Sequence, residues 1–150
     1  MVQRVYQIQS GTRRQPISPE LESLLNKVGN DLGVYFEVTS GGQPSSGPDR
    51  VGSHRHDDGG AADTKAFVLN SDGSRRYLDI SKPADQAMWA NIISAAHAGG
   101  ATGIGMAPGY MGNETAHIGF GTPAVWGAGG ASANAPDWVK TAYNSAPSVS

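Results

Sequence analysis

Residues 53–63 read SHRHDDGGAAD and place an imidazole, His56, seven positions before a carboxylate, Asp63. Small residues lie between the two and allow the chain to return tightly, so that both side chains can point at one centre. A second stretch, ETAHIGF at residues 114–120, supplies another histidine, His117. Two histidines and one aspartate form a three-ligand set for zinc with a position left open for water. This arrangement is typical of a catalytic rather than a structural metal.

Each proposed ligand also has a structural interpretation. Taken alone, His56 would be a surface-loop residue and His117 a core histidine with satisfied hydrogen bonds. The chain has four histidines, and the two proposed ligands both lie beside acids and small residues. The combination favours the zinc site over a metal-free globular domain, which is the alternative.

Other polar residues near the ligands are candidates for catalysis or substrate binding. Glu114 lies three residues before the second histidine ligand and is the candidate general base, the alternative being a solvated loop glutamate. Asp57 and Asp58 flank the first ligand and are the next candidates for the base, although adjacent aspartates in loops are usually just solvated. His54 is a candidate substrate contact, a support for a ligand, an alternative ligand or an exposed loop residue.

The bulk properties exclude several classes of protein. A chain of 150 residues suits one domain with a single modest core, and a net charge of -2 offers no basic field for nucleic acid. Without cysteine there are no disulfides, and any metal must be held by His, Asp or Glu. The N-terminus has no continuous apolar run, which argues against a signal peptide and a membrane anchor. The 21 glycines, mostly after residue 40, predict a loop-rich second half.

The residue pattern predicts an α+β domain with helices packed on one side of a small antiparallel sheet. Ser18 and Gly33 mark the two ends of the first helix, as N-cap and left-handed C-terminal residue. Helices are predicted at residues 19–32, 83–98 and 136–143, the last capped by Asn134, and strands at 2–8, 34–39, 64–69, 75–80, 103–106 and 116–120. A hairpin turn at 70–74 argues against an all-parallel sheet. Residues 127–133 are of low complexity and are expected to be extended or mobile.

Three segments together resemble a known family. The pattern HxxGxAxD at residues 56–63 resembles the SxHxxGxAxD motif of zinc D-Ala-D-Ala carboxypeptidases and L-Ala-D-Glu endopeptidases, which share the Hedgehog/DD-peptidase fold. VTSGGQP at residues 38–44 is similar to the family's VTSGYRS. GIG, HIGFG and a following tryptophan within residues 103–126 are similar to GIGxY … HVDTGxxRxW. The resemblance covers roughly residues 20–126, in the family's order.

The resemblance implies a role for each matching position. It implies that zinc is bound by His56, Asp63 and His117. Gln43 falls where many members have an arginine that contacts the substrate or its oxyanion, and His54 replaces the usual Ser. Thr115 and Gly119 stand where other members carry His and Asp, so that polar groups near the metal are lost and Glu114 becomes more necessary as the base.

The family cleaves peptide bonds in the stem peptides of peptidoglycan, so the resemblance implies a zinc metallopeptidase acting on the cell wall. Carboxypeptidase and endopeptidase action both stay open. Without a signal peptide, we expect a phage endolysin-like protein that is made in the cytoplasm and reaches the wall through a membrane pore or in a virion. We expect the whole chain, residues 1–150, to form a single zinc peptidase domain, with residues 127–150 as a Gly/Ala-rich extension too short for a separate wall-binding module. The alternative is a non-catalytic zinc-containing structural or wall-binding module, for instance a virion component.

Overall fold

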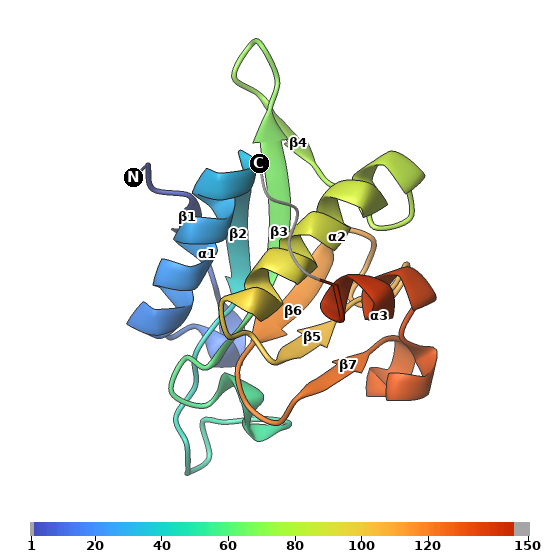
Figure 1. Ribbon diagram of the computed structural model, residues 1–150. Helices are drawn as coiled ribbons and strands as arrows, with labels where there is room; N and C mark the ends of the chain where they lie inside the picture. Colours follow the sequence, from blue (N-terminus) through green and yellow to red (C-terminus); the bar gives the residue numbers. More distant parts are fainter. Residues whose placement is uncertain (1, 146–150) are drawn as a thin grey trace.

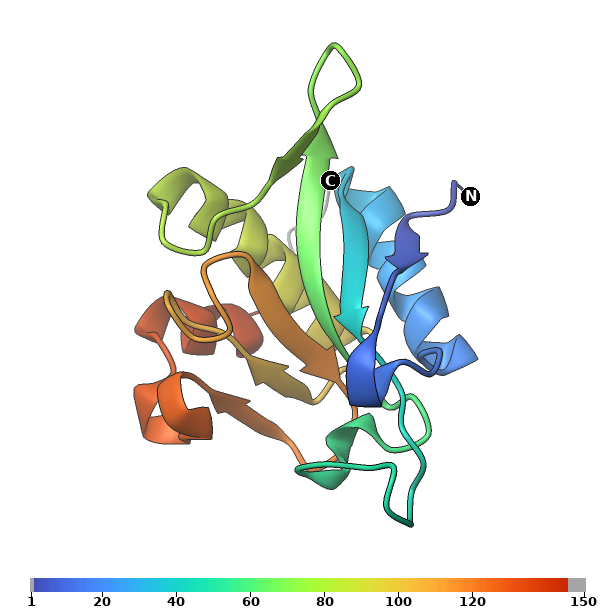
Figure 2. The same ribbon diagram turned by 180° about the vertical axis from the view of Figure 1, so that it is seen from behind.

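A mixed, open sheet of seven strands forms the centre of the computed structural model, which describes residues 2–145 (Figure 1). Three helices lie on one face of this sheet within the described residues, and Figure 2 shows the opposite face free of helices. The α+β class and the placement of the helices on one side agree with the prediction. Residue 1 and residues 146–150, the end of the extension expected at 127–150, lie outside the described residues.

The strand order is β1-β2-β3-β6-β5-β7, and β4 also pairs with β3. The strands are β1 (Val5–Gln7), β2 (Tyr35–Ser40), β3 (Ala61–Leu69), β4 (Arg75–Tyr77), β5 (Gly103–Gly105), β6 (Thr115–Gly119) and β7 (Ala124–Trp126). The prediction of an antiparallel sheet is wrong at two pairs, because β1–β2 and β5–β7 are parallel. Parallel neighbours need a crossover connection. The first helix supplies it between β1 and β2, and β6 intervenes between β5 and β7.

The helices cover the sheet through apolar side chains. They are α1 (Pro19–Leu32), α2 (Pro83–Ala98) and α3 (Asp137–Tyr143). Helix α1 has the predicted ends: the Ser18 side chain accepts a hydrogen bond from the backbone N–H of Leu21, and Gly33 has φ 72°. The largest fully buried side chains include Leu21 and Leu25 of α1, Trp89, Ile92 and Ile93 of α2, and Phe36, Ile104 and Ile118 of the sheet. Within residues 2–145, no helix is long and apolar enough to cross a membrane.

The segment before α3 differs from the prediction. Two 3₁₀ turns, Ala128–Gly130 and Ser132–Asn134, occupy the stretch at 127–133 that was expected to be extended or mobile. Asn134 does not cap α3, which begins after Pro136 without a side-chain cap, because the Asn134 amide donates to the Ala128 carbonyl instead. The amide therefore stabilises the turns rather than the helix.

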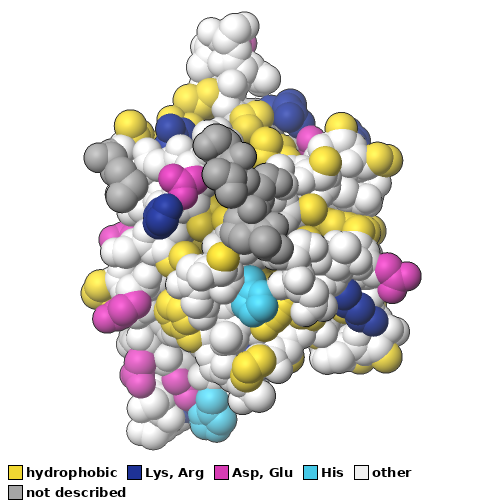
Figure 3. Space-filling view, viewed as in Figure 1, with side chains coloured by type: hydrophobic (Ala, Val, Ile, Leu, Met, Phe, Trp, Pro, Cys, Tyr) yellow, Lys and Arg dark blue, Asp and Glu magenta, His cyan; other side chains and the backbone are white. Residues whose placement is uncertain are grey.

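The two faces of the molecule differ in character. On the helical face, charged side chains of both signs are scattered among apolar and uncharged ones (Figure 3). On the other face, an aromatic cluster covers the part of the sheet formed by β1 to β4. Its members are Tyr6, Tyr35, Phe67 and Tyr77, with neighbouring ring centroids 5.2–6.2 Å apart. The part of this face formed by β3, β6 and β5 carries the candidate site.

Candidate metal centre

The structure brings the three predicted ligands together. Asp63 on β3 lies directly across from His117 on β6, so both side chains project from the same face of the sheet. His56 comes from a 3₁₀ turn, His54–His56, that precedes β3. Their ligand atoms all lie within 4.8 Å of one another, so these three residues can hold a metal ion.

The separations fit a small divalent ion. Asp63 Oδ1 is 3.5 Å from His56 Nε2 and 3.2 Å from His117 Nδ1. In a tetrahedral zinc site with bonds of about 2.0–2.1 Å, neighbouring ligand atoms are about 3.3 Å apart. Two nitrogens and one carboxylate oxygen are also donors that zinc accepts. The two separations from Asp63 are therefore close to those of a zinc site, and all three ligand atoms lie within 4.8 Å of one another.

The imidazoles are oriented for binding. His56 Nδ1 lies 2.8 Å from the Gly41 carbonyl, which can only accept, so Nδ1 is a donor to the backbone and Nε2 is the ring nitrogen that faces Asp63 and the site. His117 presents Nδ1 to the site, and its Nε2 is buried with no hydrogen-bond partner among the described residues. Both rings are nearly buried, at 2% and 6% exposure, which fixes their directions.

The electrostatics of the site favour an ionised Asp63 and a neutral His117. Burial by itself would raise the pKa of Asp63, but hydrogen bonds from His117 and His56 outweigh it and keep this pKa well below its usual range. Burial lowers the pKa of His117, and the nearby Asp63 offsets this only in part. An ionised carboxylate beside a neutral imidazole is the form in which both bind metals.

Glycine makes the turn between His56 and Asp63 possible. Gly59 has φ 82°, a conformation that side chains other than glycine rarely adopt. A Cβ there would lie 2.5 Å from the backbone nitrogen of Ser18, which donates to the Gly59 carbonyl at 2.9 Å. The start of α1 thus packs directly on the turn that carries the first ligand.

The ligands open onto a cleft of about 360 Å³. Its lining consists of Arg13, Ser53, Arg55, His56, Asp63, Tyr110, Met111, His117, Ala124, Trp126, Gly130 and Ser132. Two arginines face one aspartate in this lining, whereas the whole chain has a net charge of -2. The cleft is therefore locally cationic, and a bound dication would make it more so.

One wall of the cleft is held rigidly. The Arg55 guanidinium lies 4.6 Å above the Trp126 ring and donates to the carbonyls of Phe120 at 3.2 Å and Thr122 at 2.7 Å. The Trp126 ring in turn lies 4.8 Å from the His117 ring. This stack connects both histidine segments of the site.

Glu114, the predicted base, lies beside the site but not in the cleft lining. Its carboxylate is 3.5 Å from Lys65 Nζ, and its side chain is 41% exposed. Lys65 follows Asp63 by two residues on β3, so it projects from the same face about 7 Å further along the strand. The carboxylate is thus on the correct face of the sheet, turned toward Lys65.

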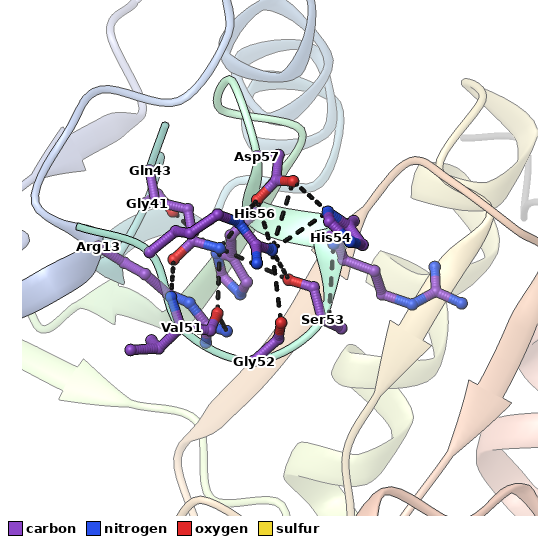
Figure 4. A network of polar contacts seen from close by, with 11 residues as sticks. Arg13, Gly41, Gln43, Val51, Gly52, Ser53, His54, His56 and Asp57 are labelled. Atoms are coloured by element: carbon purple, nitrogen blue, oxygen red, sulfur yellow. Dashed lines mark hydrogen bonds and ion pairs between the residues drawn. The ribbon is translucent and has the colours of Figure 1, made fainter. Parts of the chain in front are cut away.

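Gln43, predicted to contact substrate, is fully buried beneath the loop that precedes His56 (Figure 4). Its amide donates to Asp57 Oδ1 at 2.9 Å and to the Val51 carbonyl at 3.1 Å, and its oxygen accepts from the Val51 N–H. Every polar atom of the side chain is therefore engaged in holding this loop.

His54 and Asp57 belong to the same network (Figure 4). His54 is 79% exposed, with Nδ1 2.6 Å from Asp57 Oδ2, and Arg50 contacts both. Burial would raise the pKa of Asp57, but hydrogen bonds from Gln43, His54 and Arg50 lower it to about 2. Asp58, the other alternative base, is exposed at the surface of the loop.

The residues that the sequence did not indicate are Arg13, Arg55 and Tyr110, all in the lining of the cleft. Arg55 had one usable signal, its position directly before the first ligand. Arg13 lies far from both motifs, and only the folded chain brings it to the site. Tyr110 lies four residues before the second motif, but nothing in the local pattern distinguishes it.

Comparisons of the chain with protein-family models, curated proteins and solved structures found no match. The motif and the geometry of the site are therefore the features that indicate a function.

Proposed function

We propose that the chain is a zinc-dependent peptidase that hydrolyses peptide bonds in the stem peptides of peptidoglycan. The observation that carries this proposal is the set of His56, Asp63 and His117, held at zinc-like spacing and open to a cleft. Structural zinc sites are usually closed by four protein ligands, whereas three ligands beside a cleft suit catalysis. Its place of action would be the cell wall, after phage-type release or as part of a virion.

The lining of the cleft supports an acidic peptide as substrate. Arg13 and Arg55 offer guanidinium groups, which are well suited to carboxylates. Stem peptides, the substrates of the family that the motif resembles, carry such carboxylates. Arg55 is already fixed by its contacts with Trp126 and two carbonyls, so it would lose little freedom on binding.

A zinc ion held by His56, Asp63 and His117 would supply Lewis-acid chemistry, polarising the substrate carbonyl and making water more acidic. Glu114 takes a proton from the attacking water at a carboxylate oxygen, the water oxygen bonds to the carbonyl carbon, and the C–N bond breaks. Glu114 then gives its proton to the leaving amine nitrogen. To do so it must leave Lys65, and an exposed ion pair of this kind is worth only about 0–1 kcal/mol.

The test is Glu114→Gln, which keeps the shape of the side chain and removes the base. We expect unchanged zinc content and loss of new amino groups when the variant is incubated with purified peptidoglycan. Lys65→Met is the matched control, because it breaks the same ion pair and leaves the carboxylate. Full activity of Glu114→Gln would refute the base assignment, and an inactive zinc-loaded wild type would refute the peptidase proposal. Mass spectrometry of the released fragments would distinguish carboxypeptidase from endopeptidase action.

A second candidate is a zinc-containing module that binds the wall without cleaving it. Two observations favour it: the amide of Gln43 is engaged within its loop, and the carboxylate of Glu114 is paired with Lys65. The zinc-loaded protein would then sediment with peptidoglycan and release no amino groups.

A further inference from the structure

Tyr110 reaches the cleft from the loop between β5 and β6. A short turn holds the loop, with the Tyr110 N–H donating to the Ala107 carbonyl at 3.0 Å. The phenol ring lines the cleft, and its oxygen accepts a hydrogen bond from Trp126 Nε1 at 3.1 Å. The hydroxyl is thus positioned by a residue that itself packs against a ligand.

The position of the Trp126 nitrogen places this hydroxyl close to the site. Gly105 lies directly across from His117 in the pairing of β5 with β6. A Cβ on Gly105 would collide with Nε1 of the Trp126 indole, so the indole nitrogen rests on the sheet immediately beside His117. The Tyr110 oxygen, one hydrogen bond away from that nitrogen, lies on the adjoining wall.

The hydroxyl proton of Tyr110 is available to a ligand. An indole N–H can only donate, so it occupies a lone pair of the phenol oxygen and the phenol proton must point elsewhere. Among residues 2–145 this proton has no acceptor. By contrast, Arg55 already donates to two carbonyls, and Gln43 lies outside the cleft.

We infer that Tyr110 is a catalytic residue whose hydroxyl donates a hydrogen bond to the oxygen of the scissile carbonyl, with Trp126 as its positioning residue. This inference rests on the proposed peptidase function. The bond strengthens as negative charge develops on that oxygen during attack, and the proton stays on the phenol oxygen. Tyr110 therefore supplies the donor that Gln43 was expected to provide.

Tyr110→Phe removes the hydroxyl and keeps the ring. Loss of one such donor typically costs about 10²–10³ in kcat, and we expect a fall of that size with an unchanged KM for a stem peptide. Zinc content and thermal midpoint should stay at wild-type values. Tyr6→Phe is the matched control, because Tyr6 is an exposed phenol in the aromatic cluster outside the cleft.

A binding measurement gives a readout independent of turnover. By calorimetry, Tyr110→Phe should weaken a phosphinate analogue of the tetrahedral intermediate by the same factor as kcat, and leave binding of the product peptide unchanged. Equal weakening of both ligands would show an ordinary binding contact and overturn the inference. Unchanged kcat in Tyr110→Phe would overturn it as well, while leaving the proposed function intact if the wild type cleaves. An inactive wild type would refute the proposed function and this inference with it.

Trp126→Phe tests the positioning role. It keeps a ring against His117 and removes the N–H that orients the phenol. We expect a smaller fall in kcat than for Tyr110→Phe, and no further fall when the two changes are combined, because both act through one hydroxyl. Additive losses would mean that Trp126 acts independently of Tyr110, contradicting its role as the positioning residue.

Discussion

Replacing Asp63 by Asn distinguishes the contribution of metal binding to stability from that of packing, because the change removes one charge and almost no volume. Asp63 Oδ1 faces both imidazoles, at 3.5 Å and 3.2 Å, and its side chain is 13% exposed. Hydrogen bonds to charged groups contribute about 1.5–3 kcal/mol. We therefore expect metal-free Asp63→Asn to be less stable than the metal-free wild type by about this amount. At about 2–4 °C per kcal/mol for a domain of this size, the thermal midpoint falls by about 3–12 °C.

Zinc should then widen the gap between the two proteins. At a free zinc concentration of about 100 Kd the wild type gains about 2.7 kcal/mol, or about 5–11 °C. If loss of the anionic ligand weakens binding about 100-fold, the same zinc concentration gives Asp63→Asn only about 0.4 kcal/mol, or about 1–2 °C. Each shift is measured against the same protein without metal. The difference between the two shifts therefore reports metal binding alone and does not include the stability that the variant loses in the absence of metal.

The assay is thermal unfolding by circular dichroism after chelation, with and without added zinc, together with metal content by mass spectrometry. Asp58→Asn is the matched control. It removes a carboxylate five residues away, at an exposed position with φ 56° that Asn tolerates well. We expect its zinc shift to equal that of the wild type. Equal zinc shifts in the wild type and Asp63→Asn, or no shift in either, would refute the assignment of the ligands.

Three further predictions address the structure around the site. Gly59→Ala should lower the thermal midpoint and weaken zinc binding, because a Cβ at φ 82° would lie 2.5 Å from the backbone nitrogen of Ser18. Overpacking of this kind typically costs about 1–3 kcal/mol, so a fall in the midpoint of less than about 2 °C would contradict the prediction. Asp85→Asn should reduce the amount of stability that the protein loses between neutral and acid pH. Burial by itself would raise the pKa of Asp85, but hydrogen bonds from the Asp79 N–H and Arg76 outweigh it and lower this pKa below its usual value. The ionised Asp85 carboxylate therefore stabilises the fold above the usual aspartate pKa, and this stabilisation is lost as the pH falls through the lowered pKa. Urea midpoints at about pH 6 and pH 3 measure the slope, and an unchanged slope would argue against it. Gln43→Ala should lower the urea midpoint by leaving loop groups without partners, at about 1–3 kcal/mol each; full stability with lost cleavage would instead support the contact with substrate.

Local signals in the sequence were sufficient for α1 and for the three candidate ligands, which the structure brings together. Ser18 and Gly33 act within one turn of the helix ends, so their effects do not depend on the rest of the fold. The HxxGxAxD motif spans a single turn and the start of one strand, so its geometry is determined locally, and the structure does bring His56 and Asp63 together. His117 was found because it carries its own local pattern, although its pairing with Asp63 is long-range.

Contacts between distant segments explain what the sequence did not indicate. Strand β7 and the parallel edge pairs are only three residues long, too short to display an alternating pattern. Arg55 reaches carbonyls 65 and 67 residues away, and no local rule connects them. The partner of Glu114, Lys65, is likewise determined by the pairing of β3 with β6.

The glycines of the second half have a role beyond the loops that they predicted. Gly103, Gly105 and Gly119 lie within strands, in register with the residues around the ligands. A Cβ at Gly103 would collide with Arg55, one at Gly105 with Trp126, and one at Gly119 with the neighbouring strand. Bare backbone at Gly103 and Gly105 lets the large side chains of Arg55 and Trp126 lie against the sheet, where they form a wall of the cleft. A small sheet with short strands can thus support a preorganised site, because the side chains that hold it pack onto glycine.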